Sequence, residues 1–212
     1  FFKQKTAYEI ASCLVGSGGL ADVAASLPKT LRQRGIDCRV VMPLYGTIPQ
    51  YLRDGMHYIT NFTVPTAWRR QYCGVFWAEY DGVTFYFIDN EYYFKRSGLY
   101  GFYDDAERFS FFSRAILEML PYIDFHPDLI HTNDWQTALV PTYYYFFYSK
   151  NPWYHNIKSL YTIHNIQYQG MYGWEVNTEC VGIPEDCTKM LEMDGKLNMS
   201  KGAIETSTRV ST

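Results

Sequence analysis

The chain has 212 residues, of which 47% are hydrophobic and 19% charged, a balance that suits a globular core and excludes wholesale disorder. Its 19 basic and 22 acidic residues give a formal net charge of −3, so there is no basic surplus to bind nucleic acid. No apolar run approaches the length of a membrane span, so no membrane association is expected.

The first predicted elements are a helix and a strand. Residues 20–34 have apolar side chains at helical spacing, with Gly18–Gly19 before them and Gly35 after them. Residues 38–42 form a short apolar segment that ends at Pro43. A helix followed by a strand is half of an α/β unit.

Residues 57–89 have a different character. Two β-rich segments surround Asp81–Gly82, a dipeptide typical of a tight hairpin. Residues 104–120 return to helical spacing, with Asp104 or Asp105 expected to cap the helix.

The second half of the chain alternates between strands and helices, so we expect an α/β fold with a mainly parallel sheet, helices on both faces and a β-hairpin insertion. Residues 44–60 and 171–187 are expected to be loops. The predicted elements are a strand at 127–132, a helix at 135–148, a strand at 158–163, mostly helix at 187–206 and the start of a strand at 209–212.

One candidate site lies at the mouth of the first helix. Gly18 and Gly19 would let a ligand approach the backbone, and the helix start with Asp22 in its first turn favours a phosphate-bearing ligand. A plain glycine turn with a capping Asp is the alternative. Residues 16–21 also match the dinucleotide pattern G-x-G-x-x-A, which raises an NAD-dependent reductase. The second strand, however, ends without the acidic residue that such a site needs.

The second candidate site is His131-Thr-Asn-Asp-Trp-Gln-Thr137, which follows a predicted strand and opens a helix. In parallel sheets, ligands bind at the carboxyl ends of the strands. Asp134 could accept hydrogen bonds from sugar hydroxyls, and Trp135 would anchor the turn. Alternatively, Asn133 or Asp134 caps the helix.

The third candidate site, residues 162–170, also leaves a strand end. His164 is followed by Asn, Gln and Tyr residues that offer donors and acceptors for hydroxyl groups. A lone histidine is often only structural, which is the alternative here. The spacing of His131, Asp134 and His164 is unspecific for a metal, and the chain has no Asp-x-Asp motif, so no metal is expected.

Together these motifs resemble the bacterial glycogen synthases and plant starch synthases, glycosyltransferase family 5. GGLADVAASLPKTL, RVVMPLY, HTNDWQTALVP and YTIHNIQYQGMY follow the family's order and spacing, from about Gly18 to the last residue. The resemblance implies the Rossmann-like N-terminal lobe of a GT-B enzyme. It further implies retaining transfer of glucose from ADP-glucose to the 4-hydroxyl at the non-reducing end of an α-1,4-glucan, with no metal or other cofactor.

The resemblance also implies roles for individual residues. Gly18, Gly19 and Asp22 match the glycine loop that binds the donor. His164 and Asp134 are the expected catalytic residues, His164 holding the transferred sugar and Asp134 orienting donor and acceptor. Asn165 and Tyr100 are expected to line the glucose pocket.

The chain departs from the family at its start and its end. Gly16 stands where the family has a donor-binding lysine, and residues 1–17 do not supply the family's first strand, so we expect them to be a non-native leader. The basic and acidic motifs of a C-terminal lobe are absent from residues 18–212, so we expect this chain to be inactive alone. The sequence does not decide between ADP-glucose and UDP-glucose.

Two observations bear on the compartment and on the alternatives. The five cysteines are odd in number and lack Cys-x-x-Cys spacing, which favours a reducing cytoplasm over a disulfide framework. Aromatic residues make up 18% of the chain, the one argument for a non-catalytic glucan-binding module. That module and the NAD-dependent reductase are the competing interpretations.

Overall fold

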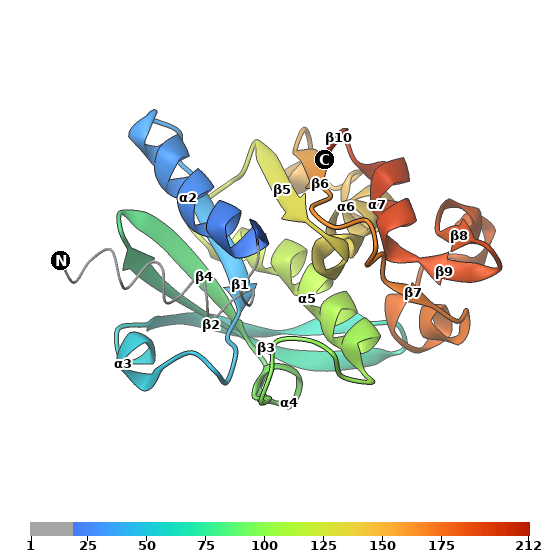
Figure 1. The fold of residues 1–212 in the computed structure, drawn as a ribbon, viewed down its shortest axis with the longest axis horizontal. Helices are drawn as coiled ribbons and strands as arrows, with labels where there is room; N and C mark the ends of the chain where they lie inside the picture. Colours follow the sequence, from blue (N-terminus) through green and yellow to red (C-terminus); the bar gives the residue numbers. More distant parts are fainter. Residues whose placement is uncertain (1–18) are drawn as a thin grey trace. The chain divides into compact units, whose positions relative to one another are not determined.

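The computed structural model describes residues 19–212, which form two compact units (Figure 1). The first unit comprises the chain up to Phe62 and Tyr72–Gly101, and the second comprises Thr63–Gln71 and Phe102–Thr212. Within the described residues, no helix is long and apolar enough to cross a membrane. The predicted non-native leader at residues 1–17 lies outside the described part of the chain.

The first unit is built on a mixed sheet with the strand order β1-β4-β3-β2. Strand β1 pairs in parallel with β4, and β4 pairs antiparallel with β3 through the predicted Asp81–Gly82 turn. Both turn residues have positive φ, 51° and 75°, as the two central residues of a type I′ turn require. The strands are β1 (Arg39–Pro43), β2 (His57–Thr66), β3 (Arg69–Tyr80) and β4 (Val83–Asp89).

In the described part of the chain, three helices accompany this sheet: α2 (Gly19–Gln33), α3 (Gln50–Arg53) and α4 (Glu91–Phe94). Leu52 of α3 and Phe94 of α4 are buried, and so are Phe85 and Phe87 of β4. The side chain of Asn90 accepts a hydrogen bond from the Tyr93 amide and so caps α4.

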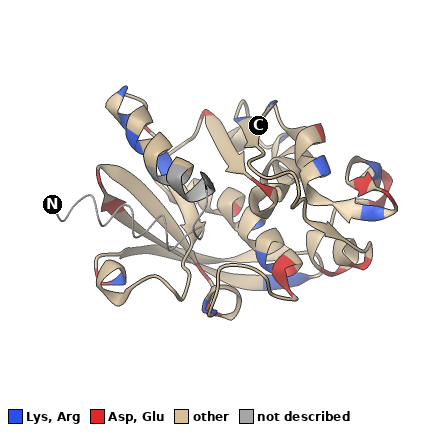
Figure 2. Ribbon diagram, viewed as in Figure 1, with Lys and Arg blue, Asp and Glu red and all other residues tan. Residues whose placement is uncertain are grey.

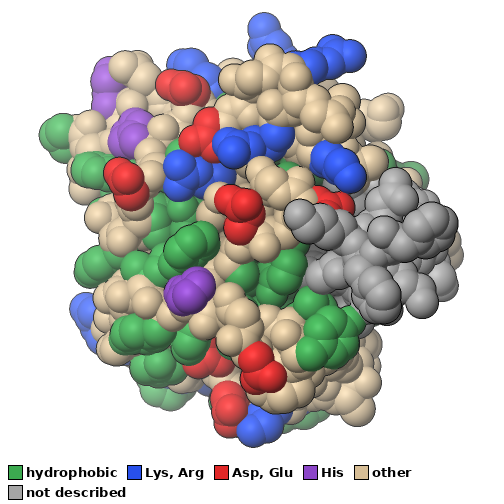
Figure 3. Space-filling view, turned by 90° about the vertical axis from the view of Figure 1, so that its left-hand side faces the viewer, with side chains coloured by type: hydrophobic (Ala, Val, Ile, Leu, Met, Phe, Trp, Pro, Cys, Tyr) green, Lys and Arg blue, Asp and Glu red, His purple; other side chains and the backbone are tan. Residues whose placement is uncertain are grey.

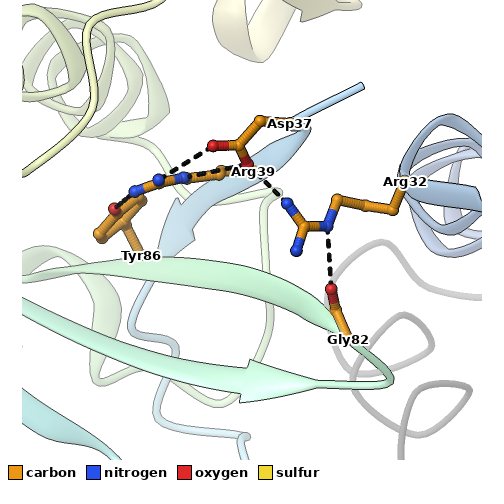
Figure 4. Close-up of polar contacts among 5 residues, drawn as sticks. All are labelled: Arg32, Asp37, Arg39, Gly82 and Tyr86. Carbon is orange, nitrogen blue, oxygen red and sulfur yellow. Dashed lines mark hydrogen bonds and ion pairs between the residues drawn. The ribbon is translucent and has the colours of Figure 1, made fainter. Parts of the chain in front are cut away.

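The C-terminal half of α2 carries basic residues that are tied to the sheet (Figures 2 and 4). Arg32 donates to the Gly82 carbonyl oxygen at 3.1 Å and to the carboxylate of Asp37 at 2.7 Å. Arg39 of β1 donates to the other oxygen of the same carboxylate at 3.0 Å and to the Tyr86 hydroxyl at 2.6 Å. Asp37 therefore links the helix to the first strand.

The second unit contains a sheet of three parallel strands in the order β10-β6-β5. Helix α5 (Asp105–Met119) is buried along most of its length, and its Arg108 is 0% exposed. Arg108 is paired with Asp105 and stacks over the rings of Phe102 and Phe109, so its buried charge has partners. The strands are β5 (Leu129–Asn133), β6 (Lys158–Thr162) and β10 (Arg209–Ser211).

The remaining elements of the second unit are shorter. A small antiparallel sheet has the order β7-β9-β8. Its strands are β7 (Met171–Tyr172), β8 (Glu192–Met193) and β9 (Lys196–Asn198). The helical elements are η1 (Leu120–Tyr122), η2 (Trp135–Thr137), α6 (Leu139–Tyr143), η3 (Tyr144–Tyr148), η4 (Pro152–Tyr154), η5 (Asn177–Val181), η6 (Glu185–Met190) and α7 (Met199–Thr206).

Most predicted elements are confirmed, with differences at three places. Residues 187–206, expected to be mixed but mostly helical, are helical in η6 and α7, and between them β8 and β9 form a turn at Asp194–Gly195 with φ of 53° and 75°. This Asp-Gly pair favours a hairpin just as Asp81–Gly82 does. The loop expected at 44–60 contains α3 and the start of β2, and the loop expected at 171–187 contains β7 and η5.

Aromatic side chains serve both the core and the surface. Tyr93, Tyr143 and Tyr161 are at most 2% exposed and belong to the core. Others reach solvent, including Trp68 at 71% and Tyr103 at 92% exposure. Figure 3 views one face of the molecule, on which hydrophobic side chains lie exposed among charged ones.

Candidate active site

The second and third predicted motifs meet at the carboxyl ends of the parallel strands in the second unit. Asn133 ends β5 and lies opposite Thr162, which ends β6, and Thr162 lies opposite Ser211 of β10. Because the three strands are parallel, the residues that follow β5 and β6 emerge at the same edge of the sheet. Asp134 and His164, which are far apart in sequence, are thereby brought into contact.

Asp134 links the two loops through its carboxylate. Its Oδ1 accepts hydrogen bonds from the backbone amides of His164 at 2.8 Å and Asn165 at 3.2 Å. The expected capping of the following helix is wrong, because the Asp134 side chain makes no cap hydrogen bond to η2. The carboxylate instead holds the start of the loop after β6.

The backbone of Asp134 is strained. Its φ of 55° and ψ of −179° fall in a region that is comfortable only for glycine. Its own amide donates to the Thr162 carbonyl oxygen at 3.0 Å, and its carbonyl oxygen accepts from the Thr137 amide at 3.2 Å. These bonds hold the strained conformation, whose cost is of order 1–3 kcal/mol. Because of this cost, such conformations are uncommon outside functional sites.

Asn133 and His164 are also in contact. The Oδ1 atom of Asn133 lies 3.0 Å from Nε2 of the His164 imidazole. The Thr137 hydroxyl accepts from the Asn133 amide and donates to its carbonyl oxygen, both at 2.7 Å. The backbone that carries the Asn133 side chain is therefore fixed on both sides.

A chain of side-chain hydrogen bonds crosses all three strands beneath these loops. Nε2 of His131 lies 2.7 Å from the Thr162 hydroxyl, which in turn lies 2.7 Å from the Ser211 hydroxyl. Burial lowers the pKa of His131, and the nearby His164 lowers it further. His131 is therefore neutral at physiological pH and can take part in the chain without bringing a charge into the sheet.

Aromatic packing supports the two loops from below. Trp135 packs edge-on against Phe109 of α5 with ring centroids 5.1 Å apart, so it anchors the turn as predicted. Gly170, in the loop after β6, has a φ of 66° and lies so close to Trp135 that a Cβ would be 2.9 Å from its Cε3 atom. Only glycine fits at this contact, which joins the third motif to the second.

The structure brings together only some of the predicted site residues. Asp134, His164 and Asn165 lie at one strand edge, and the last two are exposed. Gly19 begins α2, Asp22 lies in its first turn, and Tyr100 is 55% exposed in a turn, all in the first unit. Gly18 lies outside the described residues.

Sequence reasoning missed the contacts of Asn133 and Thr137. Asn133 was expected to act, if at all, as a helix cap, and Thr137 had no expected role. The signal for Asn133 is its place at the end of β5, where a polar side chain has no packing reason to be. Thr137 carries no such signal, because a threonine four residues downstream is ordinary in a helical turn.

The arrangement can bind an uncharged, polyhydroxylated molecule through hydrogen bonds. His164 and Asn165 present ring and amide groups to solvent, while Asp134 fixes their backbone. Among residues 19–212, no three His, Cys, Asp or Glu side chains are grouped so as to hold a metal ion. The chemistry available to these residues is hydrogen bonding and electrostatic orientation.

Comparison with known proteins agrees with this geometry. Residues 6–212 match the family described as the starch synthase catalytic domain, and the match begins within the segment predicted to be a leader. A glycogen synthase from Bacillus cereus is 48% identical over 209 residues, which are 96% of this chain and 44% of that protein. A glycogen synthase from Desulforamulus reducens is 48% identical over 195 residues, or 91% of this chain and 41% of that protein.

A solved structure has the same fold. The catalytic domain of Starch Synthase IV from Arabidopsis thaliana, bound to ADP and acarbose, has a TM-score of 0.79 and 28% sequence identity. The similarity covers 94% of this chain and 42% of that one, so the chain spans less than half the length of the relatives it matches. On this evidence the chain belongs to the starch synthase catalytic domain family, and its fold is that of the N-terminal part of such a domain.

Proposed function

We propose that the protein is part of a glycogen or starch synthase that transfers glucose from ADP-glucose to the non-reducing 4-hydroxyl of an α-1,4-glucan, with retention of configuration. The observation that carries the proposal is the contact between Asp134 and the His164–Asn165 backbone, formed by two motifs of this family. The relative from Arabidopsis is bound to ADP and to the oligosaccharide analogue acarbose, which supports these two ligand classes.

In this proposal His164 and Asn165 hold the transferred glucose, and Asp134 orients them. The bond between the anomeric carbon and the ADP oxygen breaks, a bond to the acceptor 4-oxygen forms, and the hydroxyl proton is released. Fixed donors and acceptors lower the barrier because they need no reorganisation as charge develops at the anomeric carbon. No protein nucleophile and no metal takes part.

The donor's remaining contacts are assigned to the first unit and to residues beyond this chain. Gly18, Gly19 and Asp22, which match the glycine loop of the family, bind the donor in this proposal, since the amides at a helix start favour a phosphate. Tyr100 lines the glucose pocket. We place the protein in the cytoplasm, in keeping with Cys38, Cys73, Cys180 and Cys187, which are all free thiols.

The test is incorporation of radiolabelled glucose into glycogen from ADP-glucose and, in parallel, from UDP-glucose. The protein is this chain carrying Gly16→Lys and continued by the C-terminal segment of its Bacillus cereus relative. We expect incorporation from ADP-glucose and its loss in His164→Ala. The 212-residue chain alone is expected to be inactive.

A matched control is His155→Ala. His155 is exposed and precedes the amino end of β6, whereas His164 follows the carboxyl end of the same strand. Activity should survive this change. Glucan binding without incorporation from either nucleotide sugar would instead favour the non-catalytic glucan-binding module. The family assignment leaves the NAD-dependent reductase without support.

A further inference from the structure

The side chain of Asn133 is held in place and directed at one atom of His164. Both backbone groups of Asn133 are bonded to the Thr137 hydroxyl at 2.7 Å. The parallel register sets Asn133 beside Thr162, two residues before His164. From that position Oδ1 of Asn133 lies 3.0 Å from Nε2 of His164.

The chemistry of an amide oxygen decides what this contact requires. An amide oxygen only accepts hydrogen bonds, so Nε2 of His164 must carry the hydrogen. In a neutral imidazole the other nitrogen, Nδ1, then holds a lone pair and can accept. Because the carboxamide is uncharged, it directs the proton to Nε2 without adding a charge that would favour the imidazolium.

Among the described residues, two titratable neighbours of His164 are engaged elsewhere. One oxygen of Asp134 accepts the backbone amides of His164 and Asn165. His131 has a lowered pKa and lies in the chain with Thr162 and Ser211. Within residues 19–212, the hydrogen bond between Nε2 of His164 and Asn133 is thus the contact that selects a ring nitrogen.

We propose that Asn133 is a positioning residue, which selects the tautomer protonated on Nε2 whenever the His164 ring is neutral and leaves Nδ1 free to accept a hydrogen from a sugar hydroxyl. The identity of that hydroxyl-bearing ligand rests on the proposed function. The state of the His164 ring does not, because it is a property of the chain itself.

The experiment is nitrogen-15 NMR of the histidine side chains in the 212-residue chain, at a pH where the rings are neutral. His164→Gln identifies the His164 signals. In the wild type we expect His164 as a single tautomer protonated on Nε2. Asn133→Leu, which is similar in size but has no acceptor, should give a mixture of both tautomers. Asn133→Asp restores an acceptor and should restore the single tautomer.

Gln167→Leu is the matched control, because it removes an amide side chain near His164 whose own backbone amide is bonded to Asn165. It should leave the His164 tautomer as in the wild type, and backbone spectra establish that each variant is folded. A His164 ring protonated on Nδ1 would overturn the proposal, since the amide nitrogen would then face the ring. Equal tautomer mixtures in the wild type and Asn133→Leu would also overturn it. Neither outcome depends on whether glucose is transferred.

Discussion

At the scale of single residues, Asp134 combines an unfavourable backbone with a favourable side chain. Its φ of 55° disfavours any residue with a Cβ, yet its carboxylate holds two backbone amides of the neighbouring loop. The two contributions can be separated because glycine removes both the strain and the carboxylate, whereas alanine removes only the carboxylate.

We therefore expect Asp134→Ala to be less stable than Asp134→Gly, by about 1 kcal/mol after allowing for the greater freedom of glycine in the unfolded chain. Both variants should be less stable than the wild type, because the amides of His164 and Asn165 lose their acceptor. Urea unfolding, monitored by circular dichroism, measures the order of stability of the three proteins. An alanine variant as stable as the glycine variant would contradict a strained Asp134.

Gly170 gives a second prediction with an internal control. Gly170→Ala must place a Cβ 2.9 Å from the Trp135 ring and 3.1 Å from Met199, at a φ of 66°. Gly195→Ala has a similar φ of 75° but nothing within 4 Å of the added Cβ. The two changes share the conformational cost, and only the first adds overpacking.

Gly170→Ala should consequently destabilise the protein by about 1–3 kcal/mol more than Gly195→Ala. This difference in stability is measured from the urea midpoints of the two variants, provided that the free energy of unfolding falls with the same slope against urea in both. If the two variants unfolded at the same midpoint, the close contact between Gly170 and Trp135 would not exist in solution.

At the scale of elements, the C-terminal half of α2 is fastened to its sheet by charged groups. The Arg39 guanidinium, and then Arg32, hold the pKa of Asp37 below its ordinary value. A carboxylate with a lowered pKa stabilises the folded state at pH values above its ordinary pKa, and this stabilisation is lost as the pH falls through the lowered pKa. Because the Asp37 side chain is 48% exposed, its contribution is screened by solvent.

Asp37→Asn is expected to reduce stability by about 0.5 kcal/mol at neutral pH, within the range of exposed ion pairs. This gap, the difference in free energy of unfolding between variant and wild type, should close below about pH 4, where the carboxyl of the unfolded chain is protonated. It should also narrow at high salt. Urea unfolding across pH and salt measures both trends. A gap that persisted unchanged in acid would mean that Asp37 acts through its shape and not its charge.

The elements also show what could be read from the sequence. The strands that carry the two motifs were predictable from apolar runs followed by polar turns, and Asp81–Gly82 predicted its hairpin. The contacts between Asp134 and His164 were not predictable, because they join residues that meet only once the register of β5 against β6 is set. Register in a parallel pair depends on packing and not on a turn, so the local pattern does not contain it.

At the scale of the whole molecule, several of the 20 tyrosines are buried and bonded. Burial raises the pKa of Tyr161 to about 12 and raises the pKa of Tyr143 and Tyr148 as well. The hydroxyl of Tyr143 donates to the Val181 carbonyl oxygen at 3.0 Å, a bond that the ionised form cannot make. These phenols keep their protons at pH values where an unfolded chain releases them.

A phenol with a raised pKa in the folded state stabilises the fold fully below its ordinary pKa of about 10, and this stability is lost as the pH rises through the raised value. Tyrosine ionisation followed by absorbance should therefore show two phases. The later phase should coincide with the loss of the circular dichroism signal. One early phase with an intact signal would contradict the burial of these side chains.

The hydrogen-bonded chain of His131, Thr162 and Ser211 also has a consequence for the order in which the protein matures. Its two links join residues 31 and 49 positions apart, and the second cannot form before β10 is synthesised. During translation the His164 loop therefore emerges before β10, the strand that carries Ser211. Contacts of such long range form slowly because the intervening chain must first close into a loop, so we expect the link between Thr162 and Ser211 to form after the link between His131 and Thr162.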